Sequence, residues 1–313
     1  MKNILVVGAG SIGQRHIKNL LGQNKVFCYD KKEFKLDHKN FKLIHSLKNL
    51  DFLDFIIIST PTNTHLKYAY KLLNYNKPIL IEKPLTHKFN QIECFIKECK
   101  RNNEKIFISS NMRYHIGPKT IMENVNKIGK IFFCNIKFGN YLPLMRPQID
   151  YREVYASKKS QGGGVFLDSI HEIDYAYWIL GKFKLINYVK KKISNLEINV
   201  EDFVNLNLIS HQRVQINIQL DYLRKIKKRG MEIVGEKGTL EWESTGKEKE
   251  ENKIWFYDSI QKRKKLLYKT INYKKNQPYI DMINDFLLNF NKKNNLATLE
   301  DYKFYKTIYE RIL

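Results

Sequence analysis

Residues 3–13 of the chain read Asn3-Ile4-Leu5-Val6-Val7-Gly8-Ala9-Gly10-Ser11-Ile12-Gly13. The apolar run predicts a buried strand over residues 3–8, and the residues after the glycines predict a helix over 11–21. In this Gly-x-Gly-x-x-Gly pattern, Gly8 permits a tight turn, Gly10 lets a pyrophosphate approach the backbone, and Gly13 lets the helix pack on the strand. The free N–H groups at the start of the helix attract phosphate oxygens. The pattern therefore predicts a dinucleotide-binding turn.

The rest of the first third alternates strands with helices, which predicts a doubly wound parallel sheet. Strands are predicted over residues 25–29, 41–44, 54–59, 78–81 and 105–109, and helices over 65–73 and 89–101. Asp30 follows the second strand, 22 residues after Gly8, where a carboxylate can bind both adenosine ribose hydroxyls. A carboxylate repels a 2′-phosphate, so Asp30 favours NAD. Lys31 and Lys32 follow directly and keep NADP as an alternative.

Two polar segments follow later strands of this predicted sheet. One is Ser59-Thr60-Pro61-Thr62-Asn63-Thr64-His65, and the other is Glu82-Lys83-Pro84. In an open α/β sheet, the loops at the carboxyl ends of the strands line the ligand crevice. Both segments are therefore predicted to face the cofactor, with the Lys83 ammonium near the nicotinamide.

The second half of the chain predicts a large, mostly antiparallel open sheet with few helices. Strands are predicted over residues 129–140, 185–192, 203–210, 214–222, 230–235, 239–242 and 254–257, and helices over 118–125, 278–291 and 299–312. We therefore expect an α/β Rossmann domain over residues 1–118 and an α+β domain over residues 119–313. The last helix is expected to pack back on the first domain.

Composition limits the class of protein. The chain has 313 residues, enough for two domains. No apolar run approaches the ~20 residues of a membrane span, and the start lacks the features of a signal peptide, so we expect a cytoplasmic protein with no membrane partner. The net charge of +23 attracts polyanions, but the lysines are scattered and no nucleic-acid-binding motif accompanies them. We therefore expect no nucleic-acid partner. The four cysteines form no Cys-x-x-Cys pair, and no metal site is predicted.

With these motifs the chain resembles the Gfo/Idh/MocA family of NAD(P)-dependent sugar oxidoreductases. Besides the glycine turn, the motifs that carry the resemblance are Arg15-His16, Thr60–His65, Glu82-Lys83-Pro84, Asn111-Met112-Arg113-Tyr114, Gly162–Asp174 and Trp178-Ile179-Leu180-Gly181. The resemblance implies that the cofactor is NAD and is bound by Gly8, Gly10, Ser11, Ile12, Gly13, Asp30, Thr60, Pro61, Asn63, His65, Glu82, Lys83 and Arg113. It also implies a sugar substrate, for which the candidate binding residues are Lys83, Tyr114, Arg146, Arg152, Asp168 and His171.

Asp168, His171 and Asp174 form the predicted catalytic group. A continuous helix from Asp168 to Leu180 would place all three along one face. A carboxylate can orient an imidazole whose other nitrogen exchanges a proton with a substrate hydroxyl. His171 is therefore predicted as the general acid/base, and Lys83 as the group that stabilises charge on the reacting oxygen. The commoner family pattern separates the acid from the histidine by four residues rather than three, so Asp168 either contacts substrate or only orients His171.

The segment before the glycine run narrows the substrate. Residues 141–157 resemble a branch of the family associated with surface amino-sugar biosynthesis, which implies an amino sugar or a nucleotide sugar. Arg146 and Arg152 in this segment are candidates for binding a carboxylate, a phosphate or a nucleotide diphosphate. The alternative is that both are ordinary surface arginines.

Other functions stay open at this point. Some members of the family retain NAD through a glycosidase or epimerase-type cycle with no net redox change. A non-catalytic NAD-sensing regulator is another alternative, although a sensor has no need of Lys83, Asp168 and His171. Nucleic-acid binding rests on the charge alone.

The predicted second sheet is broad, and few helices are available to cover it. Some of its strands, such as residues 130–136, lack clean polar alternation. An antiparallel sheet needs cover on both faces unless one face is polar enough for water. We therefore expect a homodimer or homotetramer that associates through this sheet, as members of the family commonly do.

Overall fold

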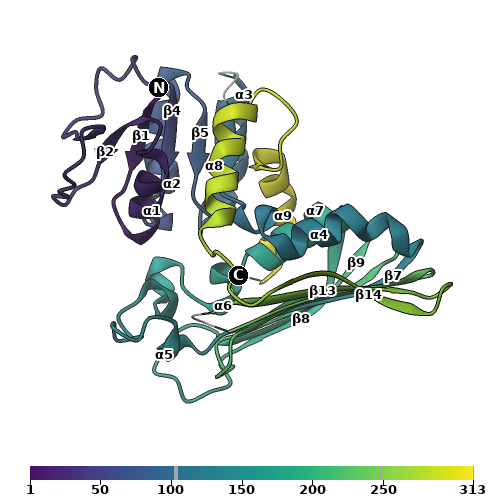
Figure 1. The fold of residues 1–313 in the computed structure, drawn as a ribbon. Helices are drawn as coiled ribbons and strands as arrows, with labels where there is room; N and C mark the ends of the chain where they lie inside the picture. The colour runs from purple at the N-terminus through teal and green to yellow at the C-terminus, as the bar shows by residue number, and fades with distance from the viewer. Residues whose placement is uncertain (102–104, 247–248, 313) are drawn as a thin grey trace. The chain divides into compact units, whose positions relative to one another are not determined.

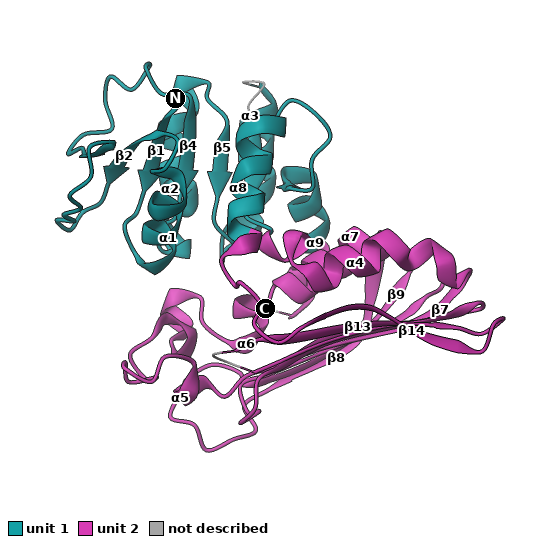
Figure 2. Ribbon diagram, in the orientation of Figure 1, with its two compact units in different colours: residues 1–110, 279–306 teal, residues 111–278, 307–313 magenta. Residues whose placement is uncertain are grey.

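The computed structural model describes residues 1–101, 105–246 and 249–312, which form two compact units (Figures 1 and 2). Unit 1 comprises Met1–Ser110 and Tyr279–Lys306, and unit 2 comprises Asn111–Pro278 and Thr307–Leu313. The sequence predicts a single boundary after residue 118. The structure divides the chain earlier because Arg113 is paired with Asp174 of unit 2, and the chain returns to unit 1 near its end. Among the described residues, no helix is long and apolar enough to cross a membrane.

The sheet of unit 1 has the strand order β15-β6-β5-β4-β1-β2-β3. Its neighbouring strands are parallel, except that β15 is antiparallel to β6. The order reverses between β1 and β4, and ligands of such sheets bind at the carboxyl ends of the strands near this reversal. The predicted doubly wound sheet is confirmed. Its strands are β1 (Asn3–Val7), β2 (Lys25–Tyr29), β3 (Phe41–Leu43), β4 (Phe55–Ile58), β5 (Ile79–Ile81), β6 (Ile106–Ile108) and β15 (Ala297–Thr298).

Helices cover this sheet because its central strands are apolar on both faces. A late segment supplies part of the cover, since the Phe286 ring packs edge-on against Phe55 and Phe107 of two strands. The Lys2 ammonium also donates a hydrogen bond to the Leu287 carbonyl, at 2.5 Å. The helices are α1 (Ser11–Leu20), α2 (His65–Leu72), α3 (Ile92–Arg101), α8 (Gln277–Asn289) and α9 (Leu299–Ile312).

Unit 2 is built on a sheet of strand order β14-β13-β12-β11-β7-β10-β9-β8. All neighbouring pairs are antiparallel except β7 and β10, which confirms the predicted mostly antiparallel sheet. The strands are β7 (Ile131–Gly139), β8 (Phe183–Lys191), β9 (Phe203–Ser210), β10 (Gln215–Asp221), β11 (Lys228–Gly235), β12 (Gly238–Thr245), β13 (Glu251–Asp258) and β14 (Arg263–Thr270).

One face of this second sheet is covered by helices of its own unit. Helix α4 (Ile116–Asn124) packs on β12 and β13, and α7 (His171–Leu180) packs on β7. Figure 2 shows both helices on the same side of the sheet. In the described part of unit 2, no helix lies along the other face, which we call the open face. The residues buried on the covered face alternate along the strands, and they include Cys134, Ile136, Phe138, Val204, Leu206, Ile216, Ile218, Met231, Ile233, Leu240, Trp242 and Ile254.

Candidate functional site

The glycine turn between β1 and α1 leaves no room for side chains at two of its three glycines. Gly8 has φ +100°, and a Cβ there would lie 2.8 Å from the Thr60 nitrogen. A Cβ on Gly13 would lie 1.8 Å from the Gly8 carbonyl oxygen, so helix and strand touch backbone to backbone. A Cβ on Gly10 would meet nothing within 4 Å. The turn is therefore tightly packed at Gly8 and Gly13 and leaves space beside Gly10. This shape fits the pyrophosphate of a dinucleotide at the start of α1, where Ser11 and Ile12 lie.

Asp30 lies just beyond β2 and holds the glycine turn in place. One carboxylate oxygen accepts a hydrogen bond from the Ala9 N–H at 2.6 Å, and the other accepts one from the Lys32 N–H at 2.8 Å. A carboxylate has about four acceptor positions, so Asp30 keeps capacity for the hydroxyls of a ribose. Its side chain thus supports the turn, and its predicted contact with the adenosine ribose stays a prediction.

The loops after β4 and β5 carry the remaining predicted cofactor residues of unit 1. A short 3-10 helix (Thr62–Thr64) precedes α2, with Pro61 and Asn63 exposed and Thr60 half-buried. The Thr64 hydroxyl donates a hydrogen bond to the Thr60 hydroxyl at 2.9 Å. His65 and Glu82 are buried, and Lys83 is half-buried. The side chains of His65 and Glu82 thus lie inside the protein, whereas Pro61 and Asn63 face the solvent.

Arg113 and Asp174 form a buried ion pair in unit 2. The Arg113 Nη2 lies 2.7 Å from Asp174 Oδ1, and its Nε also donates to both carboxylate oxygens. Both side chains are more than nine-tenths buried. The pair joins the 3-10 helix η4 (Asn111–Tyr114) to α7, and the next residue, Tyr114, is half-buried. Asp174 therefore accepts the Arg113 guanidinium inside unit 2.

The predicted continuous helix from Asp168 to Leu180 is wrong. Asp168 ends the short helix α6 (Val165–Asp168), and α7 begins only at His171. Between them, Ser169 leaves the helical region with φ −102° and ψ +33°. Asp168 and His171 therefore lie on different helices, and their separation of three residues does not place them on one helical face. His171 is 8% exposed at the first turn of α7.

Asp168 is held by two tyrosines that the sequence does not single out. The Tyr155 hydroxyl donates a hydrogen bond to Oδ1, and the Tyr222 hydroxyl donates one to Oδ2 at 3.3 Å. Tyr222 is fully buried, and burial together with the Asp168 charge raises the pKa of its phenol well above the ordinary value. Tyr222 is thus a permanent hydrogen-bond donor, whereas Tyr155 is 38% exposed. Tyr155 lies within residues 141–157, the segment before the glycine run, whereas Tyr222 follows β10 with no motif that marks it.

The glycine run before Asp168 also has a structural reason. Gly164 has φ +107°, and a Cβ there would lie 2.3 Å from a carboxylate oxygen of Glu201. That oxygen accepts a hydrogen bond from the Phe166 N–H at 3.0 Å, at the start of α6. Burial raises the pKa of Glu201. The glycine run therefore lets α6 begin next to the Glu201 carboxylate. Asp168 follows one turn later on this helix.

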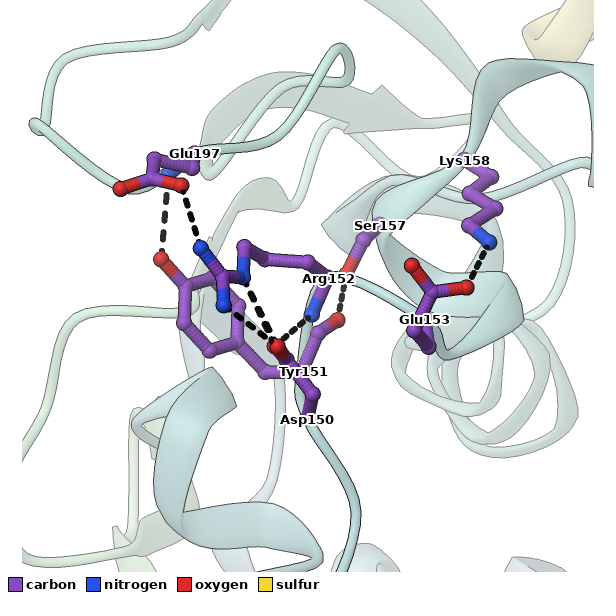
Figure 3. A network of polar contacts seen from close by, with 7 residues as sticks. All are labelled: Asp150, Tyr151, Arg152, Glu153, Ser157, Lys158 and Glu197. Atoms are coloured by element: carbon purple, nitrogen blue, oxygen red, sulfur yellow. Dashed lines mark hydrogen bonds and ion pairs between the residues drawn. The ribbon is translucent and has the colours of Figure 1, made fainter.

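Arg152 lies in a surface network rather than in an open position (Figure 3). Its guanidinium donates to both Asp150 oxygens, with Nη2 at 2.6 Å from Oδ2, and its Nη1 donates to Glu197 at 2.9 Å. The Glu197 N–H also donates to the Tyr151 hydroxyl. These contacts fold the loop of residues 150–158 on itself. Arg146 is exposed just after the short helix α5 (Leu142–Met145).

The predicted residues thus fall into two groups. Unit 1 brings together the glycine turn, Asp30, the loop after β4 and the Glu82-Lys83-Pro84 segment at the carboxyl ends of its parallel strands. Unit 2 brings Asp168 next to Tyr155 and Tyr222, and pairs Arg113 with Asp174. Arg152 binds Asp150 and Glu197, and among the described hydrogen bonds it shares no partner with Asp168.

Sequence comparison relates both units to one group of proteins. Residues 2–110 match the NAD-binding Rossmann fold of the GFO_IDH_MocA oxidoreductase family, and residues 122–241 match the GFO/IDH/MocA C-terminal domain. Myo-inositol 2-dehydrogenase of Thermotoga maritima is 29% identical over 191 residues, which cover 56% of this chain and 54% of the relative. The 2,7-anhydro-N-acetylneuraminate hydratase of Escherichia coli is 26% identical over 194 residues, covering 58% and 50%. The chain spans about half the length of these curated relatives.

Among solved structures, an oxidoreductase from Agrobacterium radiobacter in complex with NAD+, L-tartaric acid and magnesium is similar over nearly the whole chain. The TM-score is 0.78 at 13% identity, and the match covers 99% of this chain and 94% of the other. At that identity the likeness shows the fold alone. The two family domains match in order along the sequence, and the protein belongs to the Gfo/Idh/MocA family of oxidoreductases.

Proposed function

We propose that the protein transfers a hydride between NAD and a hydroxyl-bearing carbon of a sugar or sugar derivative. The observation that carries the proposal is the glycine turn, which admits no Cβ at Gly8 or Gly13 and is open at Gly10. That shape fits a dinucleotide at the strand-order reversal of unit 1. The family match to an NAD-binding Rossmann fold and a relative named myo-inositol 2-dehydrogenase support it.

Each predicted catalytic residue has a proposed role. Bound NAD would accept or return the hydride. His171 takes the proton from the substrate hydroxyl during oxidation and returns it during reduction. The Lys83 ammonium stabilises negative charge as it develops on the reacting oxygen. Asp168, which accepts hydrogen bonds from Tyr155 and Tyr222, is an oriented carboxylate suited to a substrate hydroxyl.

We further propose that the substrate is an amino sugar or a nucleotide sugar. Arg146 is exposed and is the better candidate for an anionic group of the substrate. Arg152 already donates to Asp150 and Glu197, so its contribution is to shape the loop. A screen of NAD reduction with UDP-, GDP- and CMP-sugars, free amino sugars and inositols tests the substrate class. Turnover with none of these, in either direction, would contradict the proposal.

A reaction without net redox change is the second candidate. The relative named 2,7-anhydro-N-acetylneuraminate hydratase favours it, because a hydratase gives no net oxidation of its substrate. Product analysis by mass spectrometry separates the two cases. Hydride transfer changes the substrate by two hydrogens and consumes cofactor, whereas the second candidate leaves the oxidation state of both unchanged.

Asp30 is expected to make NAD bind more tightly than NADP. In Asp30→Asn the amide oxygen still accepts the Ala9 N–H, but the charge that repels a 2′-phosphate is gone, so the two affinities should converge. Titration of both cofactors by calorimetry measures the ratio. Asp54→Asn is the control, because Asp54 also accepts a backbone N–H in unit 1, at 2.7 Å, but lies away from the turn. At least about tenfold tighter binding of NADP by the unaltered protein would contradict this reading of Asp30.

His171→Ala is expected to lower turnover by roughly 10²–10⁴-fold, the usual contribution of a positioned acid/base group. The affinity for NAD should hardly change, because His171 belongs to unit 2. The exposed His211, also in unit 2, provides the control variant His211→Ala. Steady-state kinetics on the substrate found in the screen, with thermal unfolding to verify the fold, gives the answer. Near-normal turnover of a folded His171→Ala protein would remove His171 from the mechanism.

We also propose that the protein assembles as a homodimer or homotetramer through the open face. One row of residues crosses this face from edge to edge: Asn187, Asn207, Asn217, Asn135, Glu232, Glu241, Trp255 and Leu266. Amides in the row are hydrogen-bonded along it, with Asn217 donating to Asn207 and Asn207 donating to Asn187. The row itself contains no lysine, and its carboxylates lie beside basic groups such as Lys264, whose Nζ is 3.6 Å from Glu241. This limits the net positive charge at the row in a chain of charge +23 and so reduces repulsion between two copies.

Light scattering at physiological salt is expected to give a mass of at least twice 37.3 kDa. Asn207→Arg adds a charge to the open face and should shift the protein toward monomer, because an unpaired charge is costly in an interface. Asn90→Arg, at an exposed position of unit 1, should leave the mass unchanged. A monomeric wild-type protein would refute the assembly.

A further inference from the structure

Lys83 lies between two residues that are each held by a buried histidine. On one side, His16 Nε2 lies 2.8 Å from Glu82 Oε1. On the other side, His65 Nδ1 lies 2.9 Å from the Pro84 carbonyl oxygen. The two histidines come from different helices of unit 1, α1 and α2. The segment that carries Lys83 is therefore held at both ends.

His65 also reaches a second loop. Its Nε2 lies 2.7 Å from the Thr60 carbonyl oxygen, so the ring lies between the backbone after β4 and the backbone after β5. Burial lowers the pKa of His65, and the neutral ring donates its single N–H to one of these carbonyls while it packs against the other. The side chain is only 1% exposed, and both ring nitrogens face protein carbonyls. A ring in this position has no polar atom left for a cofactor. Its predicted part in cofactor binding is therefore better explained as an indirect one.

His16 connects the same segment to the glycine turn. It lies on α1, three residues after Gly13, and is fully buried. Burial alone would raise the pKa of Glu82, but the hydrogen bond and charge of His16, with the charge of Lys83, lower this pKa below its ordinary value. A carboxylate held in this way is a strong acceptor. The Tyr279 ring packs edge-on against His16, and the Arg15 guanidinium stacks on Tyr279, so the histidine is confined from the other side.

We propose that His16 and His65 are positioning residues that fix the Glu82-Lys83-Pro84 segment against the glycine turn and the Thr60 loop. Neither histidine contacts the reacting atoms. They act by making three cofactor-facing segments move as one body, so that the Lys83 ammonium is presented at a constant place. The inference rests on the proposed function for the role of Lys83, whereas the coupling of the segments concerns the protein without cofactor.

Hydrogen exchange of the cofactor-free protein, followed by mass spectrometry, tests the coupling. In His65→Ala, exchange should increase in peptides covering both residues 59–66 and residues 82–89, because one ring restrains both. In His16→Ala, exchange should increase around Glu82 and in α1 but not at Thr60. Leu72→Ala is the control, because Leu72 is fully buried at the last residue of α2, at the opposite end of that helix from His65, and its truncation should lower stability.

The affinity for NAD gives the second readout. His65→Ala should raise the Kd by about fivefold, because the ring donates one hydrogen bond and an ordinary hydrogen bond is worth roughly a factor of five in an equilibrium constant. His65→Gln, whose amide can still donate, should recover part of the loss. Leu72→Ala should bind NAD normally well below its unfolding temperature.

The outcomes separate the inference from the proposed function. Increased exchange in both loops of His65→Ala, with rescue by His65→Gln, supports the positioning role of His65 whether or not NAD binds. Unchanged exchange in the two loops, or an increase no larger than that in Leu72→Ala, would overturn it. Failure of the wild-type protein to bind NAD would contradict the proposed function. The hydrogen-exchange result would still test whether the two histidines position the Glu82-Lys83-Pro84 segment.

Discussion

Gly13 lies so close to the Gly8 carbonyl that a Cβ would approach its oxygen to 1.8 Å. This contact brings the start of α1 directly onto the end of β1, at the reversal of strand order in unit 1. The other features of that edge follow from it. Asp30 can reach the Ala9 N–H, Ser59 can donate to the Gly8 carbonyl at 2.9 Å, and His16 on α1 can reach Glu82. Side chains thus join the carboxyl ends of four parallel strands: Asp30 and Ser59 bind backbone groups of the turn, and His16 binds the Glu82 carboxylate.

Unit 2 uses a different constraint to hold its predicted site. The end of α6 at Asp168 and the start of α7 at His171 place the two residues on separate helices, and each helix is fixed independently. Glu201 accepts from the Phe166 N–H at the start of α6, while the Arg113–Asp174 pair holds α7. Breaking one partner of such a buried pair typically costs about 3–5 kcal/mol. The position of His171 therefore depends on a buried ion pair, and that of Asp168 depends on the half-buried Glu201.

The strands of unit 1 could be predicted because β1, β4, β5 and β6 are apolar on both faces and leave no competing period. Strand β14 (Arg263–Thr270) could not be predicted. It is an edge strand, and its consecutive basic residues Arg263, Lys264 and Lys265 interrupt the alternation of apolar and polar residues. Edge strands of this kind commonly carry lysine. The interruption of the helix after Asp168 could not be predicted either, because the sequence keeps helical spacing across it. The chemistry of the glycine turn was readable from local spacing, whereas Tyr222 and Glu201 reach their partners only through long-range packing.

The proposed role of the opening beside Gly10 is to receive the cofactor phosphates. Gly10 has φ −66° and ψ −176°, a conformation open to any residue, and its Cβ would meet nothing within 4 Å. Valine can therefore replace it without disturbing the fold, while filling the space that a pyrophosphate would occupy. The most direct measurement is calorimetric titration of NAD into the wild-type and Gly10→Val proteins, with thermal unfolding of both. We expect NAD to bind the wild-type protein, binding to be lost in Gly10→Val, and the two proteins to have equal thermal stability. Equal affinity of the two folded proteins for NAD would contradict it.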